Sequence, residues 1–200
     1  WFYKEKFTWV FDLQTSNRTN LYFYMFSLFA IFKWNGIAKK CSHPHINPYR
    51  KTMHTLERHK DQLNVAGIQS VTKLNWNFLK SDIGKFKLNN KCFLLVIGGS
   101  PHRPQKRWLI ENYINLIKYL NKREICPVLI GGQSEIKYLS NKNFSKVKFK
   151  NLVGKTSYLD LAEIARKSTY IIGNDTGPMH LLVQCSNVST KKIVLFGSHS

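Results

Sequence analysis

Residues 173–180 (Gly-Asn-Asp-Thr-Gly-Pro-Met-His) combine residue types that can hold a phosphate group. Thr176 or Asp175 can cap a helix that begins here, and Pro178 suits its first turn, where a missing N–H costs nothing. The N–H groups and the dipole at a helix N-terminus attract anions. The string is also compatible with a well-capped turn that binds no ligand.

Gly177 and His180 add two features to this candidate site. Gly177 has no Cβ, so a ligand can approach the backbone closely. His180 falls within the first helical turn, where its ring can donate a hydrogen bond to a ligand oxygen. Both residues are therefore predicted to bind ligand, although a histidine at this position can also be incidental.

Residues 98–108 (GGSPHRPQKRW) form a second candidate for phosphate binding. A glycine turn is followed by a hydroxyl, Ser100, and by several cations. Backbone amides together with Ser100 and Lys106 can hold a diphosphate. The string matches neither the Walker loop nor the G-x-G-x-x-G fingerprint, which disfavours an NAD-dependent enzyme. The alternative is an ordinary basic loop.

A third candidate is the turn at residues 131–135 (GGQSE). The carboxylate of Glu135 lies just past an expected strand end, where it can accept hydrogen bonds from the diol of a ribose. In the alternative, Glu135 only complements the dipole of its own helix.

The segments that must position these residues alternate between apolar strands and helices. We expect strands at 93–97, 127–130, 151–153, 170–172 and 193–196, and helices at 107–122, at 134–141, from Thr156 or Ser157, and from Pro178. Such alternation predicts an α/β fold with a parallel sheet covered on both faces. Glycines follow the strands, and ligands of such sheets bind beyond the carboxyl ends of the strands. One functional edge is therefore expected, marked by Gly98, Gly131, Gly173 and Gly197.

The first half of the chain has weaker signals. We expect a short strand at 9–13, a buried apolar helix at 21–32, a loop at 35–52, a charged helix at 52–66 and a polar linker at 68–90. The apolar stretch at 21–32 is too short to span a bilayer.

The charge of the chain is unusual. Thirty-one basic residues face eleven acidic ones, for a net charge of +20. Such an excess favours polyanions, namely nucleic acid, anionic membrane or phosphorylated substrates. In the alternative, lysines are spread evenly over the surface and the excess reflects composition alone.

Four cysteines, none in a C-x-x-C pair, indicate a reducing compartment, and no secretory signal is visible. Cys92 and Cys126 abut apolar runs and are expected to be buried. The chain begins with Trp1 and stops at a strand-and-turn signal, so we interpret it as a fragment.

Taken together, the three candidate strings resemble the C-terminal domain of the ADP-heptose:lipopolysaccharide heptosyltransferases, glycosyltransferase family 9. The matching elements span residues 93–197 and comprise the glycine turn with Lys-Arg-Trp (106–108), Gly-Gly-x-x-Glu, Asn-Leu-Val-Gly-Lys-Thr-Ser (151–157) and the string at 173–180. Upstream, 11–14 with Arg18 looks like the second-strand region of the family's acceptor domain, and 54–67 looks like its later helix.

The resemblance implies two facing Rossmann-like domains of the GT-B type. Residues 1–88 would be a partial acceptor-side domain with its linker, and residues 89–200 the domain that binds the nucleotide-sugar donor. Lys106 would contact the donor phosphate and Glu135 the ribose, while Ser100 lies in the same turn as Lys106. The diphosphate and sugar would be held by Asp175, Thr176, Gly177 and His180.

The reaction implied by the resemblance is an inverting transfer of heptose, or a related sugar, from an ADP-sugar to a glycolipid such as the lipopolysaccharide core. No cofactor and no essential metal are implied. The family's general base lies in a glycine-rich loop that would precede Trp1, so the catalytic residue is unknown and Asp12 is not assigned as the base. The chain alone is accordingly expected not to turn over.

The expected location is the cytoplasm, with peripheral contact to anionic lipid on the inner face of the inner membrane. A metal site at His43 and His45 is disfavoured, because two histidines in one loop are a weak signal when no carboxylate stands nearby in the sequence. The competing functions are a basic nucleic-acid-binding module, which lacks a recognition motif here, and a nucleotide-sugar enzyme of another GT-B family. Lysines clustered above Gly98 and Gly177 would favour the transferase.

Overall fold

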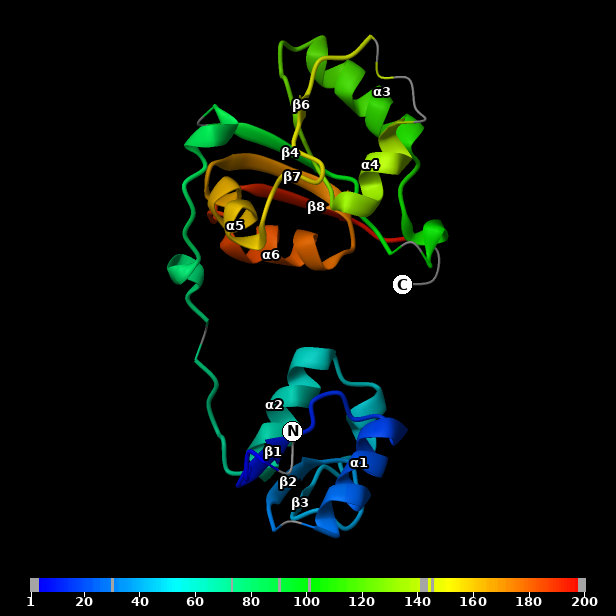
Figure 1. Ribbon diagram of the computed structural model, residues 1–200, viewed down its shortest axis with the longest axis vertical. Coiled ribbons are helices and arrows are strands. Elements are labelled where there is room, and N and C mark those ends of the chain that lie inside the picture. The colour runs from blue at the N-terminus through cyan, green and yellow to red at the C-terminus, as the bar shows by residue number, and fades with distance from the viewer. Residues whose placement is uncertain are drawn as a thin grey trace. The chain divides into compact units, whose positions relative to one another are not determined.

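The computed structural model describes residues 4–29, 31–72, 74–89, 91–100, 102–140, 144 and 146–197. The chain divides into two compact units, Trp1–Leu74 and Asn75–Ser200. Figure 1 shows both units, each of which has helices packed on a parallel sheet.

The first unit is a small α/β layer. Its parallel sheet has the order β1-β2-β3, formed by Trp9–Phe11, Lys33–Gly36 and His43–Pro44. Helix α1 (Asn17–Ser27) connects β1 to β2, and helix α2 (Thr55–Val65) follows β3. A core cluster of Phe23, Trp34, Ala38 and Cys41 joins α1 to the sheet.

Three expectations for this unit were wrong. Strand β2 begins just after the expected helix at 21–32 and runs into the expected loop at 35–52, and β3 lies within that loop. Both strands are short and carry Gly36 and Pro44, so the sequence pattern indicated a loop. Helix α1 starts earlier than predicted, since Ser16 and Thr19 form a capping box. The helix is also not buried all round: Phe23 is its buried residue, whereas Leu21, Tyr22, Tyr24 and Met25 are exposed.

The second unit has a five-stranded sheet with the order β6-β5-β4-β7-β8. The strands are Cys92–Val96 (β4), Val128–Ile130 (β5), Lys150–Asn151 (β6), Ser168–Asn174 (β7) and Lys191–Leu195 (β8). All neighbouring strands pair in parallel, so the predicted parallel sheet is confirmed. The strand order places a topological switch point between β4 and β7. Gly173 differs from the expectation in lying inside β7, paired with Val96, because the strand continues to Asn174.

Helices cover both faces of this sheet (Figure 1). One face packs against α5 (Tyr158–Arg166) and α6 (Gly177–Cys185), and the other against α3 (Ile110–Asn121) and α4 (Gln133–Ser140). Successive residues of β4 alternate between the two cores: Leu94 and Val96 face α5 and α6, whereas Leu95 faces α3. Such alternation is the period of two of a strand covered on both faces.

The boundary between the units falls after Leu74, earlier than the expected boundary after residue 88. The polar composition of residues 75–88 suggested a linker, but this segment packs on the second unit. Ile83 and Phe86 are buried in the core next to α5. Arg166 donates hydrogen bonds of 2.8 Å to the carbonyls of Trp76 and Leu79, which fastens the segment to α5.

Two cysteines were expected to be buried, and the structure buries one of them and exposes the other. Cys92 is buried in β4, and this burial raises the pKa of its thiol. Cys126 is exposed, which contradicts the expectation, because it lies in the turn before β5 and not in the strand.

Candidate functional site

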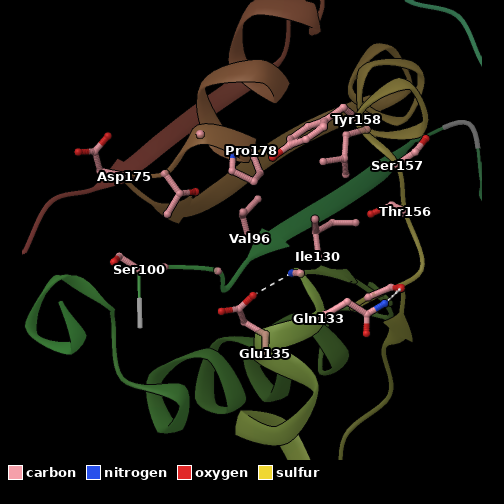
Figure 2. Close-up of a pocket in the computed structure, with 18 residues that line it drawn as sticks. Val96, Ser100, Ile130, Gln133, Glu135, Thr156, Ser157, Tyr158, Asp175 and Pro178 are labelled. Carbon is pink, nitrogen blue, oxygen red and sulfur yellow. Dashed lines mark hydrogen bonds between the residues drawn. The ribbon is translucent and has the colours of Figure 1, made fainter. Parts of the chain in front are cut away.

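A pocket of about 640 Å³ opens at the carboxyl edge of the second unit's sheet. The ends of β4, β5 and β7 contribute to it, at the switch point where ligands of doubly wound sheets bind. Its walls come from the predicted turns at 98–100, 131–135 and 175–178, together with residues 154–161. Figure 2 shows Val96 and Ile130 between these turns, where they form an apolar floor.

Five residues of the predicted site line this pocket, namely Ser100, Glu135, Asp175, Thr176 and Gly177. Lys106 and His180 do not line it. Among the described lining residues there is no lysine or arginine, so the pocket does not show the lysine cluster that would have favoured the transferase over a nucleic-acid-binding module. Any anion held in this pocket would therefore depend on backbone N–H groups and on a helix dipole.

Helix α6 supplies that N-terminus. Thr176 is its N-cap, and the Thr176 side chain accepts a hydrogen bond from the N–H of Met179. A Cβ built on Gly177 would meet no atom within 4 Å, so the first residue of the helix faces open space. Because the first N–H groups of a helix have no carbonyl partner within it, this end is suited to an anion.

Asp175 and His180 lie on the outer side of the same turn. The Nε2 atom of His180 is 3.0 Å from Oδ1 of Asp175, and the His180 side chain is 71% exposed. In Figure 2 the carboxylate of Asp175 is directed away from Val96 and Ile130. The contact thus holds the exposed His180 ring beside Asp175, which lines the pocket.

Glu135 is the buried carboxylate of the site, with an exposure of 3%. Its Oε2 accepts a 2.8 Å hydrogen bond from the N–H of Gly132, the residue just before helix α4. Figure 2 marks this hydrogen bond with a dashed line. Its Oε1 lies 3.1 Å from Nη2 of Arg107 and accepts a 2.9 Å hydrogen bond from Ser134. Both sequence interpretations of Glu135 are consistent with this geometry, because it lines the pocket and also caps helix α4.

Lys106 ends a short 3-10 helix, Pro104–Lys106, outside the pocket. A Cβ on Gly197 would come within 2.6 Å of the Cα of Lys106, so the backbone of this segment packs tightly against the segment after β8. Gly197, expected to mark the ligand-binding edge, thus has a packing role toward Lys106.

The structure adds pocket residues that the sequence did not single out. Tyr158, the first residue of α5, lines the pocket and is 67% exposed. Gln133 lines it as well and donates a 2.9 Å hydrogen bond to the carbonyl of Gly154. Gly154 adopts a φ of +71°, which favours glycine. A glycine just after a short strand was the signal that could have placed this turn at the same sheet edge.

The first unit has its own polar cluster at the carboxyl end of β1. Asp12 is buried, and its Oδ1 accepts a 2.9 Å hydrogen bond from the N–H of Thr15. The guanidinium of Arg50 donates to the hydroxyl of Thr15. Burial, followed by the charge of Arg58, lowers the pKa of Arg50.

The histidines considered for a metal have other partners. Nε2 of His45 lies 2.7 Å from Oδ2 of Asp61, and Nδ1 of His43 is 2.9 Å from the Ser42 hydroxyl. Hydrogen bonds from His45 and Asn47 lower the pKa of Asp61. Within the described residues, no group of three or more histidines, cysteines or carboxylates could hold a metal ion. No helix in the described ranges is long and apolar enough to cross a membrane.

Comparison with protein families gives one match over nearly the whole chain. The model described as glycosyltransferase family 9 (heptosyltransferase) matches residues 9–200. No curated protein matches the sequence significantly.

Solved structures show the same fold at low sequence identity. A glycosyltransferase family 9 protein from Veillonella parvula is 20% identical with a TM-score of 0.61, over 88% of this chain and 50% of that one. ADP-heptose lps heptosyltransferase II of E. coli is 15% identical with a TM-score of 0.58, over 99% and 71%. E. coli heptosyltransferase WaaC with ADP is 17% identical with a TM-score of 0.59, over 94% and 61%. The chain thus spans half the length of the Veillonella protein.

Proposed function

This chain belongs to glycosyltransferase family 9, and we propose that it serves to transfer a heptose, or a related sugar, from an ADP-sugar to a lipopolysaccharide core or similar glycolipid. The observation that carries the proposal is the pocket at the switch point of the second unit. It combines an apolar floor, a buried carboxylate and a helix N-terminus, which suit the base, ribose and diphosphate of a nucleotide. One similar structure, of E. coli heptosyltransferase WaaC, contains ADP, and another structure of that protein contains ADP-2-deoxy-2-fluoro heptose.

In this proposal the diphosphate lies against the N-terminus of α6. Thr176 and Gly177 present the backbone there, and Ser100 adds a hydroxyl from the turn after β4. Asp175 and His180 would contact the sugar at the rim, while Lys106 would approach the phosphates from outside the present pocket. The dipole of the helix favours negative charge at this end.

The ribose would donate hydrogen bonds to Glu135, and the base would occupy the apolar part of the pocket. Val96, Ile130 and Leu161 line that part, and the ring of Tyr158 offers a face for stacking. An aromatic face binds a base through its π system without selecting strongly among bases. The preference for adenine is therefore expected to come from polar groups at the edge of the pocket.

Donor binding is tested by calorimetry with ADP, UDP and GDP on the whole chain, and by thermal shift with each nucleotide. ADP is expected to bind more tightly than the others and to raise the melting temperature, because a ligand that binds the folded state stabilises it. Inorganic diphosphate alone is expected to bind more weakly than ADP, since it leaves the apolar floor empty. Equal affinity for all three nucleotides would argue against an ADP-sugar donor.

Transfer itself is proposed to invert the anomeric centre without an essential metal. The general base is not assigned among the described residues. Because this chain alone is expected not to turn over, an assay of ADP release with ADP-heptose and a lipid-linked acceptor, with and without EDTA, tests this mechanism on the full-length enzyme. Retained activity in EDTA and an inverted product are expected.

The location proposed is the cytoplasm, with peripheral contact to anionic lipid. The net charge of +20 supports it, because each basic residue near an anionic surface contributes about 1 kcal/mol to binding. Co-sedimentation with anionic and with neutral vesicles is the test. Equal binding to both would remove the electrostatic part of this proposal.

A further inference from the structure

Arg107 lies buried between two of the turns that form the pocket. Its side chain is 12% exposed, and Nη2 donates hydrogen bonds to the carbonyl of Gly99 and, at 3.1 Å, to Oε1 of Glu135. A Cβ on Gly99 would lie 2.7 Å from Cγ of Arg107 and 2.9 Å from its Nε. The absence of a side chain at Gly99 is therefore what lets the arginine pass beneath the turn.

The geometry points to Arg107 as a positioning residue for nucleotide recognition: we propose that it holds the Glu135 carboxylate in the orientation in which Oε2 accepts a ribose hydroxyl. This inference rests on the proposed function, because it assumes that the pocket binds a ribonucleotide. Arg107 itself does not line the pocket, so it would act through Glu135 and not by touching the ligand.

The hydrogen-bond inventory of Glu135 supports this role. A carboxylate offers about four acceptor positions, two on each oxygen. Oε1 accepts from Arg107 and Ser134, and Oε2 accepts from the N–H of Gly132. The remaining position is on Oε2, which lies only 3.8 Å from where a Cβ of Gly98 would be. Arg107 thus occupies one oxygen and leaves the other for a ligand in the space beside Gly98.

The charge of Arg107 matters because Glu135 is buried. A buried carboxylate that loses its cation keeps the desolvation cost without the attraction that offsets it. Without Arg107, Glu135 would rotate toward solvent, and this change would remove the acceptor from the ribose. A lysine could supply the charge, but its shorter side chain does not place two N–H groups where Nη2 of Arg107 donates to both Gly99 and Glu135.

The competing interpretation is that Arg107 only ties the turn at Gly99 to helix α4. The two interpretations differ in their effect on ribose hydroxyls. A structural tie would affect every ligand of the pocket, whereas a positioning residue would affect only ligands that carry the hydroxyls. A pair of nucleotides that differ only in those hydroxyls therefore separates them.

The experiment compares the affinities of ADP and 2′,3′-dideoxy-ADP by calorimetry on the whole chain and on Arg107→Met, Arg107→Lys and Glu135→Gln. The wild-type chain is expected to prefer ADP by about tenfold or more, the size of a hydrogen bond to a charged group. Arg107→Met should lose most of that preference with its affinity for dideoxy-ADP unchanged. Arg107→Lys should keep part of it, and adding Glu135→Gln to Arg107→Met should weaken ADP binding no further.

Each other outcome is decisive. If Arg107→Met weakens both nucleotides equally, or leaves the preference intact, Arg107 does not position Glu135. If Arg107→Met does not fold, Arg107→Lys decides. A full wild-type preference in Arg107→Lys, together with its loss in Glu135→Gln, would show that Glu135 does not need the Arg107 guanidinium to hold it. If the wild-type chain binds dideoxy-ADP as well as ADP, this inference fails while nucleotide binding stands. Absence of binding to either nucleotide would instead overturn the proposed function, and this inference with it.

Discussion

The side-chain oxygen of Asn174, at the end of β7, accepts a 2.9 Å hydrogen bond from the backbone N–H of Trp108, just before helix α3. The amide nitrogen of the same side chain donates to the carbonyls of Ile97 and Gly98, at 3.1 and 3.0 Å. Asn174 is almost completely buried. One side chain thus joins the end of β7 to the turn after β4 and to the segment that leads into α3.

Replacing Asn174 with alanine should therefore destabilise the second unit. The change leaves two carbonyls and one N–H buried without these partners, and each such loss costs about 1–3 kcal/mol. We expect the free energy of unfolding in urea to fall by roughly 3 kcal/mol or more. The matched control is Asn77→Ala at an exposed position, which should change stability little. Equal losses in the two variants would show that the Asn174 network is not the cause.

Lys106→Ala tests the phosphate contact that the sequence implies. A charge-assisted hydrogen bond contributes about 1.5–3 kcal/mol, so the affinity for ADP should fall by about tenfold or more. Lys106 does not line the pocket, so this effect requires its side chain to move inward when ADP binds. Calorimetry on Lys106→Ala, beside the exposed Lys122→Ala, provides the measurement. Unchanged affinity for ADP would remove Lys106 from the site.

Tyr158 is expected to stack on the base of the nucleotide. Tyr158→Ala should weaken ADP binding by about fivefold or more, since stacking on an aromatic side chain contributes about 1–3 kcal/mol per base. Tyr158→Phe keeps the ring and should bind ADP like the wild-type chain. Inorganic diphosphate has no base, so its affinity should be the same for all three proteins. A loss of diphosphate affinity in Tyr158→Ala would indicate damage to the turn and not a lost stacking contact.

The sheet of the second unit could be predicted from the sequence because each central strand is a continuous apolar run. Cys92–Val96 and Val128–Ile130 are covered by helices on both faces, so nearly every residue is apolar and the alternation with helices sets the parallel order. The first unit could not be predicted as well. Lys33–Gly36 and His43–Pro44 are too short for a periodic pattern, and they form strands because neighbouring backbone is available to pair with them.

The candidate site also has a part that could be predicted from the sequence and a part that could not. Ser100, Glu135 and Thr176 come together in one pocket because residues just beyond parallel strands share an edge, which is a rule that the sequence can use. Tyr158 and Arg107 could not be placed in this way. Their positions depend on side-chain packing, on the turn at Gly154 for one and on the missing side chain of Gly99 for the other.

Asp160 connects the segment 75–88 to helix α5. Its Oδ1 accepts a 2.6 Å hydrogen bond from the hydroxyl of Ser81, and its Oδ2 accepts a 2.9 Å hydrogen bond from the N–H of Ser157. Lys85 lies 3.2 Å from Oδ1. Burial raises the pKa of Asp160, but the hydrogen bonds from Ser81, Ser157 and Lys85 outweigh it and lower the pKa to about 2.

This lowered pKa predicts a stability that depends on acid pH. Because the pKa in the folded state is below the unfolded value of about 4, the ionised Asp160 stabilises the fold above pH 4, and its contribution is lost as the pH falls from about 4 to 2. A difference of this size corresponds to about 2 kcal/mol.

Asp160→Asn should thus be less stable than the wild-type chain by about 2 kcal/mol at pH 7, and the gap should shrink steadily between pH 4 and pH 2. Urea unfolding of both proteins across this range measures the gap, and the difference cancels the other carboxylates, which the two proteins share. A gap that stays constant with pH would show that the hydrogen bonds of Asp160 do not depend on its charge.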